Sequence, residues 1–216
     1  MTAPGTQGRR SNRRGLATRE NMLEAAIRSL ASGDPGSVSA ARIAKDIGAT
    51  WGAVKYQFGD VDGLWAAVLH HTAELRGALP APSESDAPLH QRVAAIIDLL
   101  YDGLTSAHSR AIENLRAALP SDPDELERLY PRTAAEFVSW GHSWNASCQQ
   151  AFADLGVDPA RILEVAAFIP GAMRGITSER QLGSFTDLEV ARRGLTNAIT
   201  AYLNPVSTDQ GRHRSQ

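Results

Sequence analysis

The segment that decides the fold runs from residue 39 to residue 58 and reads SAARIAKDIGATWGAVKYQF. Ser39 and Thr50 both suit the N-cap of a helix, because their hydroxyls can accept a hydrogen bond from the first turn. Gly48 lies between the two apolar patterns and breaks them. The segment therefore predicts two short helices joined by a tight turn, at about residues 39–47 and 50–58.

The small and apolar residues of this segment have the spacing of a helix-turn-helix unit. Ala44 is small where the later helix crosses close over the earlier one, and Gly48 adopts the left-handed conformation of a tight turn without steric cost. The apolar residues that face the contact are Ile43, Ile47 and Val54. An ordinary helical hairpin requires only apolar periodicity, so it leaves the small residue and the glycine unexplained.

The remainder of the chain also has helical periodicity, and no alternating run is long enough for a strand. A first helix is predicted over residues 18–30 and a fourth from an N-cap at Asp60, followed by a proline-rich seam at residues 80–88. Later helices are predicted near residues 89–106 and 108–119 and after the Asp122 start signal, with a kink or break near Tyr130 caused by Pro131. A last helix begins with a capping box at Thr186. The fold class is all-α, with about nine helices.

Composition narrows the class of protein. The 216 residues are 43% hydrophobic and 21% charged, which is not typical of a disordered chain. No apolar run approaches the roughly 20 residues of a membrane-spanning helix, and the first thirty residues contain no secretory signal pattern. With Cys148 as the one cysteine, we expect no internal disulfide and a reducing, cytoplasmic location.

The charge is divided by position. The chain as a whole has a net charge of -2, but residues 1–60 hold nine basic and five acidic side chains, which leaves 13 basic and 19 acidic ones for residues 61–216. The first part is therefore at +4 and the second at -6. A basic segment joined to an acidic body is expected where one end of a protein meets a polyanion.

The segment continues as GDVDGL at residues 59–64. Residues 48–64 resemble the recognition-helix and fourth-helix segment of the tetracycline-repressor-like (TetR) transcriptional regulators, and the resemblance extends over about residues 18–79. The family usually has a tyrosine and, two places later, a histidine where this chain has Lys55 and Gln57, and it commonly has a lysine where this chain has Val61.

The charge pattern, the proline-rich seam and the polar tail, together with the resemblance, predict four parts. They are a basic disordered arm at residues 1–17, a DNA-binding domain at 18–79, an effector-binding and dimerisation domain at 80–204, and a disordered tail at 205–216. A recognition helix enters the major groove with its first residues at base edges, while its neighbours hold phosphates. The predicted DNA contacts are Arg9, Arg10, Arg13, Arg14, Arg42, Thr50, Trp51, Gly52, Ala53, Lys55, Tyr56 and Gln57, with Trp51 exposed.

The resemblance further implies a homodimer through the last two helices, at about residues 159–176 and 187–202. Gly171 and Gly175 would permit close approach, and an apolar face is predicted at Leu188, Leu195, Ala198, Ile199 and Tyr202. It also implies a small-molecule pocket, for which a bulky apolar or aromatic effector is expected. Its candidate residues are Tyr101, Ile112, Leu115, Phe137, Trp140, Trp144, Cys148, Phe168 and Met173.

Three functions remain open at this stage. The first is a repressor that binds a palindromic DNA operator and is released by its effector, with activation as a variant. The second is a helical protein-interaction adaptor, which would leave the basic segment unexplained. The third is a small all-α enzyme, but no catalytic residues are predicted because no nucleophile elbow or phosphate-binding loop occurs. No cofactor or metal is expected, since the six histidines include no His-x-x-x-His pair.

Overall fold

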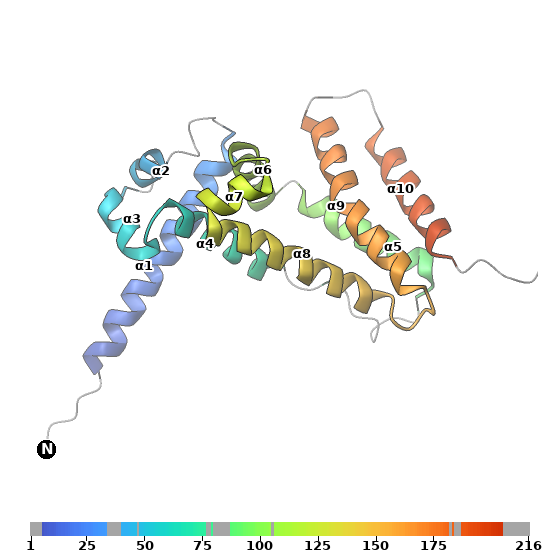
Figure 1. The fold of residues 1–216 in the computed structure, drawn as a ribbon, viewed down its shortest axis with the longest axis horizontal. Coiled ribbons are helices and arrows are strands. Elements are labelled where there is room, and N and C mark those ends of the chain that lie inside the picture. The colour runs from blue at the N-terminus through green and yellow to red at the C-terminus, as the bar shows by residue number, and fades with distance from the viewer. Residues whose placement is uncertain are drawn as a thin grey trace, which may run out of the picture. The chain divides into compact units, whose positions relative to one another are not determined.

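The computed structural model describes residues 6–33, 40–46, 48–76, 87–104, 106–181 and 187–204, together with Leu79 and Gly183. These residues form ten helices and no strand (Figure 1), so the predicted all-α fold is confirmed with one helix more than expected. The helices are α1 Thr6–Ala31, α2 Ala40–Asp46, α3 Trp51–Phe58, α4 Val61–Arg76, α5 Leu89–Gly103, α6 Ala107–Ala118, α7 Pro123–Leu129, α8 Pro131–Ala151, α9 Pro159–Gln181 and α10 Leu188–Leu203.

The extra helix arises at Tyr130, where a break was predicted. Tyr130 has φ -137° and ψ 61°, so the helix that starts after Asp122 ends at Leu129 and a new one begins at Pro131. Proline suits the first position of a helix because it has no N–H to leave unsatisfied. The predicted cap is also confirmed, since the Asp122 carboxylate accepts a hydrogen bond from Glu125 N at 2.9 Å.

The N-terminal end of α1 differs from the prediction. We expected a disordered arm at residues 1–17 and a helix from Thr18, but α1 begins at Thr6. No proline interrupts residues 6–17, and arginine is a good helix former. Leu16, near the start of the part of α1 whose side chains are described, is exposed.

The caps of the other helices mostly follow the prediction. The Thr50 hydroxyl accepts from Ala53 N at 3.2 Å, and the Asp60 carboxylate accepts from Gly63 N at 2.9 Å. At α10 the capping residue is Asp187, whose carboxylate accepts from the backbone N–H groups of residues 189 and 190. The predicted caps Ser39 and Thr186 lie outside the described residues, as does the tail at 205–216.

The chain forms two compact units, and unit 1 comprises residues 1–77 and 105–140. Its core contains Ile27 and Leu30 of α1, Leu64 of α4 and Leu115 of α6, all fully or almost fully buried. Residues 105–140 thus pack with the helix-turn-helix elements, although we expected a boundary near residue 80. The reason is that one face of α6 is apolar and packs on α1, where Asn114 Nδ2 donates to Leu30 O at 2.7 Å.

Unit 2 comprises residues 78–104 and 141–216, with α5, α9, α10 and the second part of α8. Its core includes Ile97, Cys148, Ala166 and Ile199. Burial of the Cys148 thiol raises its pKa to about 12. None of the described helices combines the length and the apolar character that crossing a bilayer requires.

Candidate nucleic-acid interface and effector residues

The turn between α2 and α3 has the geometry that the sequence predicts. Gly48 has φ +66°, the left-handed region, and its N–H donates to Lys45 O at 3.0 Å. Ala44 is buried where α3 packs over α2, and Val54 is fully buried on the inner face of α3. The inner face of α3 is therefore anchored in the core of unit 1, which determines which residues face outward.

The outward face of α3 carries aromatic, basic and small residues. Trp51 is 38% exposed, as predicted, and Tyr56 is 87% exposed. The other exposed residues of this face are Thr50, Gly52 and Lys55. A Cβ added at Gly52 would meet only the Thr50 hydroxyl, at 3.7 Å. Packing among the described residues therefore gives no reason for a glycine at this position.

Two further predicted DNA contacts on α3 are only partly exposed. Ala53 is half-buried and packs against the core, and Gln57 is half-buried. Arg19 of α1 donates to Gln57 O at 2.9 Å, and its guanidinium lies 4.5 Å from the centre of the Phe58 ring. Arg19 thus holds the C-terminal end of α3 against α1, a role that its place in the sequence does not indicate.

The remaining predicted contacts are basic side chains. Arg42 of α2 is about half exposed and lies 3.9 Å from Asp46. The residues Arg9, Arg10, Arg13 and Arg14 belong to the first turns of α1, but their side chains are outside what the structure describes.

The corner between α3 and α4 is held by α8. The buried carboxylate of Asp62 accepts from Arg132 N at 3.0 Å, Thr133 N at 2.9 Å and the Thr133 hydroxyl at 2.7 Å. The Arg132 side chain donates to the same carboxylate at 3.2 Å, to Phe58 O at 3.3 Å and to Asp60. Burial raises the pKa of Asp62, but these hydrogen bonds outweigh it and hold the pKa below its usual range.

Gly63 makes this close corner possible. A Cβ at this position would lie 2.0 Å from Phe58 O and 2.5 Å from the Arg132 guanidinium. No side chain fits there, so the backbone of α4 approaches the end of α3 only with glycine. Asp62 and Gly63 belong to the segment that resembles the TetR regulators, whereas Arg132, their partner, lies 70 residues beyond Asp62 and no sequence signal links the two.

The nine candidate effector residues fall in different units. Ile112, Leu115, Phe137 and Trp140 belong to unit 1, and Tyr101, Trp144, Cys148, Phe168 and Met173 to unit 2. Of these residues, Ile112, Leu115, Cys148 and Met173 are buried core residues and Phe168 is exposed.

Four of the aromatic candidates make hydrogen bonds or ring contacts within their own units. Trp144 Nε1 donates to Ala166 O at 2.7 Å, and the Arg192 guanidinium lies 5.0 Å from the centre of the Tyr101 ring. Phe137 and Trp140 meet edge to face at 6.3 Å. A groove of about 440 Å³ in unit 1, lined in part by Arg19, Gln57 and His71, contains none of the nine candidates.

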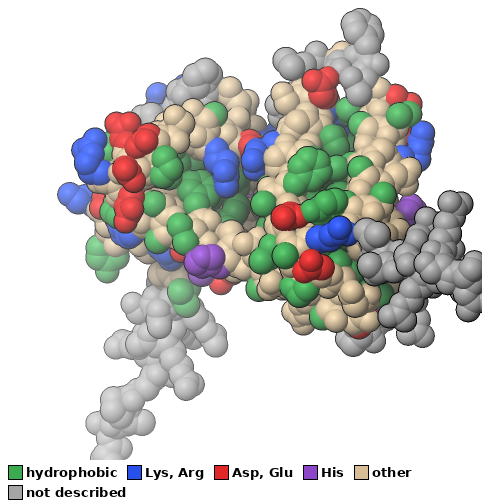
Figure 2. Space-filling model, turned by 45° about the vertical axis from the view of Figure 1, so that its right-hand side comes forward, with side chains coloured by type: hydrophobic (Ala, Val, Ile, Leu, Met, Phe, Trp, Pro, Cys, Tyr) green, Lys and Arg blue, Asp and Glu red, His purple; other side chains and the backbone are tan. Residues whose placement is uncertain are grey.

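The outer faces of α9 and α10 carry apolar and small residues, and Figure 2 shows apolar side chains gathered on this part of the surface. The exposed residues of α9 include Leu163, Ala167, Phe168, Gly171 and Gly175, and those of α10 include Val190, Gly194, Ala198 and Tyr202. The predicted apolar face of the last helix is partly wrong: Ile199 is buried in the core of unit 2 and Leu195 packs against it.

No protein-family model and no curated protein matches the chain. Solved structures match its fold: a TetR-family member from Streptomyces coelicolor is 24% identical with a TM-score of 0.59, covering 88% of this chain and 99% of that one. NalD, the secondary repressor of the MexAB-OprM multidrug efflux pump in Pseudomonas aeruginosa, is 19% identical with a TM-score of 0.61, covering 87% and 97%. The multidrug binding protein EbrR complexed with proflavin is 20% identical with a TM-score of 0.51, covering 83% and 98%.

These neighbours define the class of fold. They include members of the TetR family and a repressor of a multidrug efflux pump. The chain therefore has the all-α fold of TetR-family regulators, with the helix-turn-helix of that fold at α2 and α3.

Proposed function

We propose that the chain is a DNA-binding transcriptional regulator, a homodimeric repressor that binds a palindromic operator and is released by a small apolar or aromatic effector. The observation that carries the proposal is the outward face of α3, where an aromatic ring and an ammonium stand exposed on a helix whose other side is buried.

This face matches what a recognition helix needs. The first residues of such a helix lie at base edges, so Thr50 and Trp51 contact bases and the Trp51 ring packs on a thymine methyl. Lys55 and Tyr56 follow one turn later and contact phosphates. Gly52 lets the helix backbone approach the DNA, a role that its open surroundings support.

Dimerisation follows from the length of DNA that one module can read. A single helix-turn-helix contacts few base pairs, whereas a two-fold dimer reads two half-sites. The outer faces of α9 and α10 supply a surface with small residues at Ala167, Gly171 and Gly175, where a second copy can approach closely. In a two-fold dimer the same patch of both copies forms the interface, so this one surface would serve both partners.

The effector is proposed to bind in unit 2, where Tyr101 and Trp144 are half-buried aromatic residues. EbrR, which shares the fold, is a multidrug binding protein with proflavin bound, and proflavin is a planar aromatic dye. The effector must bind better to the conformer that does not fit the operator, because only a difference in affinity shifts the equilibrium. Proflavin is a suitable first ligand because its fluorescence reports binding directly.

The DNA-binding test measures fluorescence anisotropy of labelled DNA from the region upstream of the protein's own gene. Trp51→Ala should weaken specific binding by about 1–3 kcal/mol and leave non-specific binding unchanged. Lys55→Ala should weaken binding to all sequences and reduce the salt slope by about one. Arg76→Ala at the C-terminal end of α4, the end away from α3, removes the same charge and is expected to bind like wild type.

Wild type that binds all DNA sequences equally, with no change in either α3 variant, would contradict a regulator and favour the adaptor.

For the dimer, Ala167→Arg on the outer face of α9 should give monomers in analytical ultracentrifugation and lose operator binding. Ala117→Arg, an exposed alanine of α6, is the matched control and should stay dimeric.

A further inference from the structure

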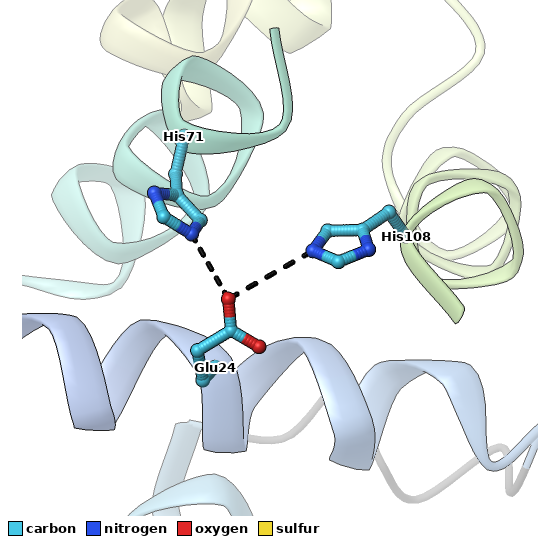
Figure 3. A group of neighbouring side chains, drawn as sticks. All are labelled: Glu24, His71 and His108. Carbon is cyan, nitrogen blue, oxygen red and sulfur yellow. Dashed lines mark hydrogen bonds and ion pairs between the residues drawn. The ribbon is translucent and has the colours of Figure 1, made fainter. Parts of the chain in front are cut away.

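Three metal-binding side chains from three helices of unit 1 meet at one point. Glu24 of α1, His71 of α4 and His108 of α6 turn their polar atoms toward one another, with one Glu24 oxygen facing both imidazoles (Figure 3). Glu24 Oε1 lies 3.1 Å from His71 Nε2 and 3.9 Å from His108 Nε2. Within the described chain this is the one group of three or more histidine, cysteine or acidic residues close enough to share an ion.

The distances suit a small divalent ion. Zinc binds imidazole nitrogen and carboxylate oxygen at about 2.0–2.2 Å, so ligand atoms around a tetrahedral ion lie about 3.3 Å apart. The three ligand atoms here all lie within 4.8 Å of one another. Closing them around an ion therefore requires shifts of about an ångström, which side-chain rotations supply.

The three ligands belong to helices that are anchored by buried residues of unit 1. Leu23, Thr72 and Ile112 are buried neighbours of the three ligands on their own helices. The cluster itself is partly open, with side-chain exposures of 38% for Glu24, 16% for His71 and 31% for His108. His71 also lines the 440 Å³ groove of unit 1, which gives an ion a path from solvent and room for a water ligand.

The His108 Nε2 atom makes the cluster more than a surface ion pair. This nitrogen is shielded from solvent and makes no hydrogen bond with any described residue, while it faces the Glu24 carboxylate. A shielded imidazole nitrogen without a hydrogen bond costs stability. Coordination of an ion would satisfy it, and would also satisfy the Glu24 charge.

We propose that Glu24, His71 and His108 bind one Zn²⁺ ion per chain, with water at the open position. Two imidazoles and one carboxylate form a donor set that divalent transition ions prefer over Mg²⁺ or Ca²⁺. The bound ion links α1, α4 and α6 within unit 1. This site does not depend on the DNA-binding function proposed above.

The test uses untagged full-length protein freed of metal by a chelator and titrated with Zn²⁺ in a calorimeter. Wild type should bind about one equivalent. Each of Glu24→Gln, His71→Gln and His108→Gln should lower the affinity at least 100-fold, since even residues that only support metal ligands cost about 10–100-fold. His70→Gln is the matched control, because His70 is the neighbour of His71 on α4 but lies near Glu74 and Glu136 instead.

A second measurement covers variants that fold poorly. Since the ligands come from three helices, Zn²⁺ at a hundredfold excess over its Kd should raise the Tm of wild type by about 5–10 °C. Co²⁺ should give the visible absorption of a four- or five-coordinate site with wild type and His70→Gln, but not with the three ligand variants. No saturable binding by wild type, or binding that the ligand variants retain, would overturn the proposal.

Discussion

Among the arginine–aspartate pairs of the described residues, one pair in each unit has a buried partner, and the two pairs have opposite burial. In unit 1 the carboxylate of Asp62 is buried, with 9% of its side chain exposed, while 49% of the Arg132 side chain is exposed. In unit 2 the Arg92 guanidinium is the buried partner, with 9% of its side chain exposed against 48% for Asp154. The same chemical pair thus places opposite charges in the two cores.

The difference in burial follows from the end of α8 to which each pair is hydrogen-bonded. Asp62 accepts from the backbone N–H groups of residues 132 and 133, in the first turn of α8. Arg92 donates to Ala151 O, at the last residue of α8, at 3.1 Å. A carboxylate at the N-terminus and a cation at the C-terminus both match the helix dipole and satisfy groups that the helix leaves unpaired. The buried partner in each pair is the one that caps α8.

The largest effect is expected where the backbone itself blocks a change. Gly63→Ala should lower the free energy of unfolding by more than about 3 kcal/mol, because the new Cβ would lie 2.0 Å from Phe58 O and the corner must open. It should also weaken operator binding, since Phe58 ends α3. Urea unfolding and DNA anisotropy measure the two effects.

Gly52→Ala is the matched control for this change. A Cβ there meets only the Thr50 hydroxyl at 3.7 Å, so the fold should tolerate it, and alanine favours the helix by up to about 1 kcal/mol. If Gly63→Ala unfolds at the same urea concentration as Gly52→Ala, the tight corner is not required.

A smaller effect is expected from the buried carboxylate. Asp62→Asn should cost about 2 kcal/mol, because an amide NH₂ replaces one of the oxygens that face the Arg132 and Thr133 donors. Arg132→Gln should cost less, because the backbone N–H groups of residues 132 and 133 and the Thr133 hydroxyl still donate to the Asp62 carboxylate. Urea unfolding compares the two, and the reverse order would contradict the assignment of Asp62 as the capping partner.

In unit 2 the buried partner is the cation, and its removal should cost less again. Arg92→Met keeps most of the apolar volume and leaves Asp154 half exposed to water, so we expect a loss of about 1 kcal/mol from the lost hydrogen bonds to Ala87 O and Ala151 O. Operator binding per folded dimer should remain, because Arg92 and α3 belong to different units. A loss of DNA affinity as large as that of Gly63→Ala would contradict this separation.

The local parts of the fold could be predicted from the sequence. Thr50, Asp60 and Asp122 cap their helices as expected and Pro131 separates α7 from α8, because caps and breakers act within one helical turn. The exposed side of α3 was also predicted, since the buried positions of a short helix determine the opposite face.

The contacts between distant segments could not be predicted. The sequence carries no sign that Arg132 would meet Asp62, or that Glu24 would meet His71, 47 residues away. The absence of a short histidine spacing led us to expect no metal site, yet the candidate ligands come from three different helices. Apolar residues at helical spacing likewise do not distinguish an effector pocket from a core, and Ile112 and Leu115 proved to be core residues of unit 1.

The smallest expected effect of the two pairs is on how the free energy of unfolding changes in acid. The pKa of Asp154 is below its usual range because its carboxylate accepts hydrogen bonds from Arg92, and the pKa of Asp62 is lowered by its hydrogen bonds despite burial. In the unfolded chain both groups take up protons at a higher pH than in the folded one, so the unfolded state gains stability as pH falls. Their contribution to the free energy of unfolding is therefore complete above the unfolded pKa, which is near 3.8, and is lost as pH falls through the pKa values of the folded state.

Urea unfolding at a series of pH values below about 5 should give a shallower acid slope for Asp62→Asn and for Asp154→Asn than for wild type. Slopes that match wild type in both variants would show that neither pair holds its charge differently in the folded state.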